Sequence, residues 1–61
     1  MNDTKQKFLK IYADLPLGVR KEIVLTLDDK PMTWEVVFIE VNNDTALSKI
    51  ILGKLEKLGI I

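Results

Sequence analysis

The chain has 61 residues, with nine basic and nine acidic side chains, so its formal net charge is zero. A chain this short forms one domain at most and buries only about 60% of its unfolded surface. It has no cysteine and no histidine, which excludes disulfides, thiolate or imidazole chemistry and nearly all transition-metal sites.

The first predicted element is a helix over residues 4–13, which Asp3 or Thr4 can cap. Its apolar residues recur at helical spacing on one face: Phe8, Ile11, Tyr12 and Leu15. Pro16 interrupts this pattern, because proline cannot continue a helix and disfavours helix in the residue before it. A second helix is predicted to start near Pro16 or Gly18, and its inner face holds Val19, Ile23, Val24 and Leu27.

Residues 28–31, with the sequence DDKP, predict a turn. Thr33 is a suitable N-cap for a third helix, and Glu35 in its first turn complements the helix dipole. The third helix has apolar residues at i, i+3, i+4 and i+7: Trp34, Val37, Phe38 and Val41. The fourth helix is expected to begin after residues 43–45 and to end near Leu58, before Gly59. Its predicted apolar face holds Leu47, Ile50, Ile51, Leu55 and Leu58.

The link between the last two helices is so short that they must cross steeply, as in a helix-turn-helix unit. The predicted fold is therefore a small all-α domain of four helices, in which residues 19–58 form the helix-turn-helix unit. The alternative is an α-β-β-α fold, because residues 24–27 and 34–41 are rich in β-forming residues and residues 28–31 could join them in a hairpin.

Four segments carry a resemblance to the winged helix-turn-helix domain of bacterial and archaeal repressors of the arsenical-resistance and multiple-antibiotic-resistance types. They are residues 17–23 (LGVRKEI), 30–35 (KPMTWE), 44–49 (DTALSK) and 55–61 (LEKLGII). The first is similar to the family's segment before its first domain helix, and the second to the loop and cap of its second helix. The third resembles the start of the recognition helix, and the fourth the helix end that leads into the wing. The resemblance reaches Ile61 and no wing is expected, and no cysteine or histidine is present for metal sensing.

The resemblance implies a small DNA-binding, transcription-regulatory protein with residues 45–58 as its recognition helix. At the polar start of that helix, lysine and serine are side chains that can reach base edges, and the other basic residues can contact phosphates. Free N–H groups at a helix start can also take a phosphate oxygen. The candidate DNA contacts are Thr45, Ser48, Lys49, Arg20, Lys21, Lys54, Lys57 and Thr33. The alternative is a protein–protein interaction module of the same fold with no nucleic-acid role, which the acidic segment 32–44 favours.

Leu9, Ile39 and Leu52 fall off the predicted apolar stripes, and such residues often cover a partner surface. They predict a homodimer whose two recognition helices would read half-sites spaced by one helical turn or a multiple of it. No signal peptide or membrane span is expected, and the absence of cysteine favours the cytoplasm. Because no carboxylate lies beside a histidine, a serine elbow or a glycine-rich loop, we expect no enzymatic activity, no cofactor and no metal.

Overall fold

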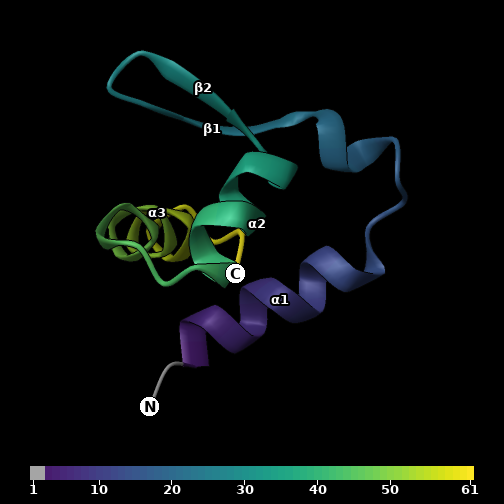
Figure 1. Ribbon diagram of the computed structural model, residues 1–61, viewed down its shortest axis with the longest axis horizontal. Helices are drawn as coiled ribbons and strands as arrows, with labels where there is room; N and C mark the ends of the chain where they lie inside the picture. Colours follow the sequence, from purple (N-terminus) through teal and green to yellow (C-terminus); the bar gives the residue numbers. More distant parts are fainter. Residues whose placement is uncertain (1–2) are drawn as a thin grey trace.

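The computed structural model describes residues 3–61. Three helices and one two-stranded antiparallel sheet follow one another along the chain (Figure 1). They are helix α1 (Asp3–Asp14), a 3-10 turn η1 (Val19–Lys21), strands β1 (Ile23–Leu27) and β2 (Lys30–Thr33), and helices α2 (Trp34–Asn42) and α3 (Ala46–Lys57).

The predicted all-α fold is wrong, because the segment expected to be the second helix forms η1 and β1 instead. The run Ile23–Leu27 consists of β-branched residues and leucines, which suit a strand. Asp28 and Asp29 then both adopt positive φ, at 49° and 66°, as the two central residues of a type I′ hairpin turn do. The molecule is a mixed α+β fold.

The alternative α-β-β-α fold is also incorrect in its second strand. A hairpin turn does lie within residues 28–31, but β2 ends at Thr33 and residues 34–41 are helical. The Thr33 hydroxyl accepts a hydrogen bond from the Val36 N–H at 3.1 Å, and this cap starts α2 despite the β-branched residues that follow. The helices predicted over 4–13, 34–41 and 45–58 are confirmed within one or two residues.

The hairpin is irregular at its open end. Leu27 pairs with Lys30 and Leu25 with Met32, but the register shifts between Ile23 and Leu25, which is a β-bulge. The shift lets the chain leave β2 directly into α2, and the Trp34 N–H donates to the Glu22 carbonyl at 3.1 Å to fix that exit.

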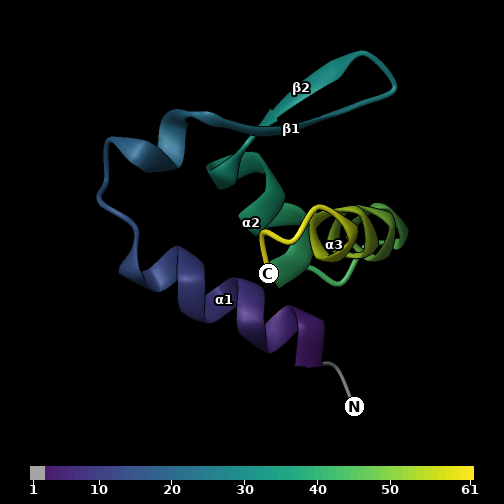
Figure 2. The same cartoon turned by 180° about the vertical axis from the view of Figure 1, so that it is seen from behind.

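Helix α2 lies at the centre of the molecule, with the hairpin on one side and α1 on the other (Figures 1 and 2). The core forms where α1, α2 and α3 meet, and the hairpin adds Leu25 and Met32 to it. Its fully buried side chains are Phe8, Val37, Val41, Ile51 and Leu55. Among residues 3–61, no helix is both long and apolar enough to cross a membrane.

The four aromatic rings form a stacked series next to this core. Phe8 stacks on Tyr12 and on Trp34, each with ring centroids 6.0 Å apart, and Tyr12 stacks on Phe38 at 4.3 Å. Because the rings come from α1 and α2, their stacking fixes how these two helices lie against each other.

Candidate nucleic-acid interface

Helices α2 and α3 are joined by the short turn of residues 43–45 and pack against each other. Asp44 takes a positive φ of 51° at the turn, and its carboxylate accepts from the Lys5 ammonium at 2.7 Å. The Thr45 hydroxyl accepts from the Ser48 N–H at 3.0 Å and donates to the Glu40 carboxylate at 2.6 Å. These bonds hold the first turn of α3 in a fixed position relative to α2 and α1.

Helix α3 has a buried face and a cationic face. The buried face is made by Ser48, Ile51, Leu52 and Leu55. Residues of an α-helix follow one another at about 100° around its axis, so positions 49, 50, 53, 54 and 57 share the opposite side. There they line an open groove of about 340 Å³: Lys49, Ile50, Gly53, Lys54 and Lys57.

The apolar face of α3 therefore differs from the predicted one. Ile50 and Leu58 were expected inside but are 59% and 60% exposed, whereas Leu52, expected outside, is 5% exposed. Leucines and isoleucines lie next to each other along α3, so the sequence allows more than one apolar face. Only the packing against α1 and α2 selects the face that is buried.

Within residues 3–61, none of the three lysines of the groove forms a salt bridge with a carboxylate. Across residues 3–61, the single salt bridge joins Lys5 to Asp44. Glu56, the one carboxylate of α3, lies at the edge of the cationic face by helical geometry. The groove is thus a site of local positive charge on a molecule whose net charge is zero.

Four of the eight predicted DNA contacts have their polar groups engaged within the protein. Thr33 and Thr45 are N-caps, and the Ser48 hydroxyl, which is buried, donates to the Thr45 carbonyl at 2.6 Å. The Arg20 guanidinium lies 4.5 Å from the centre of the Tyr12 ring and donates to the Tyr12 and Ala13 carbonyls. These side chains stabilise the fold, and Ser48 has no surface to offer to a ligand.

Among the other four, Lys49, Lys54 and Lys57 come together in the groove, whereas Lys21 does not join them. Lys21 is exposed in η1, which lies on the opposite side of α2 from α3 in both views (Figures 1 and 2). Ile50 and Gly53 also line the groove and were absent from the predicted contacts. The spacing 49, 50, 53, 54, 57 is the signal that could have found them, because it marks one helical face.

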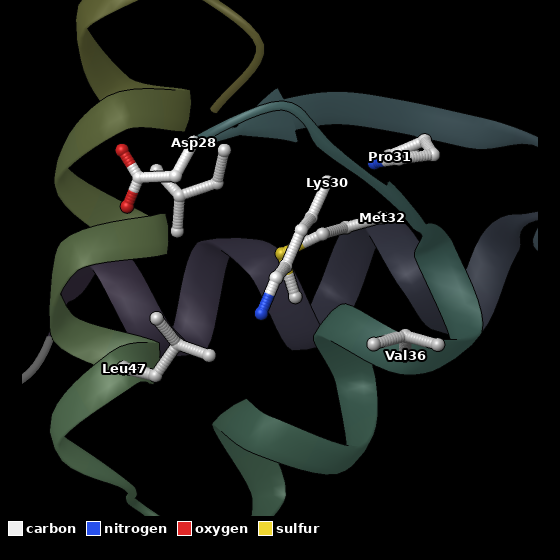
Figure 3. Close-up of a pocket in the computed structure, with 7 residues that line it drawn as sticks. Asp28, Lys30, Pro31, Met32, Val36 and Leu47 are labelled. Carbon is white, nitrogen blue, oxygen red and sulfur yellow. The ribbon is translucent and has the colours of Figure 1, made fainter.

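A second hollow of about 310 Å³ lies between the hairpin and the first turns of α2 and α3 (Figure 3). It is lined by Leu27, Asp28, Lys30, Pro31, Met32, Val36 and Leu47. Figure 3 shows the Met32 thioether and the Lys30 side chain on the side of the hairpin that faces the helices. Sequence reasoning missed this hollow because it placed residues 24–27 in a helix.

The predicted dimer residues do not form one surface. Leu52 belongs to the core, Leu9 is partly buried and packs against it, and Ile39 is 53% exposed. A dimer interface could use Ile39 but cannot include Leu52.

No family model, no curated protein and no solved structure matches this chain. The resemblance to winged helix-turn-helix repressors therefore stays a prediction, carried by the four sequence segments. In the structure the hairpin precedes α2, whereas the wing of that family would follow α3.

Proposed function

We propose that this protein binds double-stranded DNA through the cationic face of α3, in a transcription-regulatory role. The observation that supports it most is the groove in which Lys49, Lys54 and Lys57 lie together, without a salt bridge to any carboxylate of residues 3–61, on the second of two helices joined by a short turn. A helix in this position can enter a major groove while its lysines contact phosphates and guanine edges.

The aromatic residues favour duplex over single-stranded nucleic acid. Proteins that hold single strands stack successive bases on exposed aromatic rings. Here all four rings stack on one another between α1 and α2, and α3 contains none. The cationic face therefore offers charge and a groove but no platform for unpaired bases.

The charge of the face limits the strength of binding. If the three lysines of the face neutralise three DNA phosphates, the plot of log K against log salt concentration has a slope of about −2.7. We therefore expect weak, strongly salt-dependent binding by one copy, and tighter binding where two copies place two α3 helices on adjacent half-sites. A homodimer and a cytoplasmic location belong to this proposal.

The test is a titration of labelled protein with a mixed-sequence duplex at low and then moderate salt. Lys49→Glu should abolish binding, because it replaces a phosphate-binding cation with a repelling charge, and should change the melting temperature little because the side chain is exposed. Lys21→Glu makes the same charge change on the other side of α2 and should leave binding close to that of the native protein.

Two results contradict the proposal: no change of amide signals in α3 even at low salt, or equal loss of binding in both lysine variants. If the Lys49→Glu variant unfolds instead, Lys49 does not lie on an exposed face of α3 and the cationic face is assigned wrongly.

The second candidate function is a protein-interaction module, and the apolar hollow beside the hairpin favours it. Leu27, Met32, Val36 and Leu47 give that hollow a largely apolar lining, which is typical of surfaces that accept a partner's side chains. Absence of DNA binding at low salt would make this the better account.

A further inference from the structure

Gly53 lies inside α3 with no requirement for glycine from its own fold. Glycine is the least favourable residue in a helix apart from proline, so it normally has a local reason there. A Cβ built on Gly53 would meet no atom within 4 Å, and the residue is exposed in a helical conformation. Gly59 differs, because its φ of +77° is a conformation that other residues rarely adopt.

The space left by the missing side chain is the middle of the cationic groove. Lys49 lies four residues before Gly53 and Lys57 four residues after it, about 6 Å away along the axis in each direction. All three residues line the same groove. A side chain at position 53 would project between the two lysines, where a polyanion contacting both of them has to pass.

We propose that Gly53 is the point at which the backbone of α3 makes its closest approach to the DNA duplex; this rests on the proposed function. A major groove is about 12 Å wide and an α-helix with its side chains is about 10–12 Å across, so the fit is tight. Removing one side chain from the facing surface lets the helix backbone sit deeper. The ammonium groups of Lys49 and Lys57 can then reach DNA phosphates on the two sides of Gly53.

The test compares two substitutions at this position, Gly53→Ala and Gly53→Gln, in duplex binding by fluorescence anisotropy and in thermal unfolding. Both should raise the melting temperature, by about 4–8 °C for alanine, because both residues favour helix and meet no clash. Both should weaken binding, alanine by roughly five- to tenfold and glutamine by more, since each holds the lysines away from the phosphates. Asn42→Ala, an exposed substitution at the end of α2, tests whether added helix stability alone alters DNA binding. It should leave binding unchanged.

The outcomes separate this inference from the proposed function. If Gly53→Ala and Gly53→Gln bind as well as the native protein while Lys49→Glu does not, DNA binding stands and the close approach at Gly53 is wrong. If Lys49→Glu binds like the native protein, the cationic face is not the DNA site and both proposals fall. Both proposals are supported if the Gly53 variants are more stable than the native protein and bind DNA more weakly, while Asn42→Ala does not lose binding.

Discussion

Arg20 shows how one residue can be misread from sequence and still be important. On sequence it is a candidate phosphate contact, next to Lys21 in a basic pair. In the structure its guanidinium covers the Tyr12 ring and donates to the Tyr12 carbonyl at 3.1 Å and the Ala13 carbonyl at 3.4 Å. Those carbonyls belong to the last turn of α1, whose C=O groups have no partner within the helix. Arg20 therefore acts as a distant C-cap for α1.

We expect Arg20→Ala to lower the free energy of unfolding by about 1–3 kcal/mol, through loss of the charged hydrogen bonds and of the contact with the Tyr12 ring. Chemical denaturation measures this change. Lys21→Ala next to it should stay within about 0.5 kcal/mol of the native protein, because Lys21 is exposed and makes no such contact. Equal effects at the two positions would contradict the capping role.

At the scale of elements, the hairpin is where sequence reasoning failed, and the reason is physical. Four of the five residues 23–27 are apolar and only Thr26 is polar, so the segment fits a buried helix face or a strand equally well by periodicity. The Asp28–Asp29 turn, with its two positive φ values, decides in favour of the strand. An Asp-Asp pair is a weaker sequence signal for such a turn than Asn-Gly. By contrast Thr33 predicted a helix start correctly, and the cap of the last helix, Thr45, is one of the three residues 43–45 expected there, because an N-cap acts through bonds to its own helix.

This turn gives a prediction about stability. Replacing Asp28 and Asp29 together by Asn and Gly should raise the free energy of unfolding by about 1 kcal/mol, since Gly adopts positive φ without strain and Asn tolerates it. Thermal or denaturant unfolding checks it, with Asp14→Asn combined with Glu22→Gln as a control that also removes two exposed negative charges. A loss of stability in the double variant would mean that the turn geometry is different.

At the scale of the whole molecule, the composition shows no cysteine or histidine and a net charge of zero, but it does not reveal how charge is distributed over the surface. Zero net charge argues against a nucleic-acid binder, yet folding gathers Lys49, Lys54 and Lys57 in one groove. The spacing of these residues predicts a shared helical face. Which side of α3 turns outward could not be read from the sequence, because apolar residues lie on both sides of that helix and only tertiary packing distinguishes Ile50 from Ile51.

The stack of aromatic rings makes the protein its own optical reporter. Trp34 is the only tryptophan in the chain; it stacks on Phe8 and takes no part in the groove. Its emission should therefore follow separation of α1 from α2 on denaturation and stay constant when duplex DNA is added. Folding can then be read at the indole and binding at a dye on the DNA, in a single cuvette. A Trp34 signal that changed with DNA under native conditions would reveal a rearrangement reaching from α3 to the ring stack.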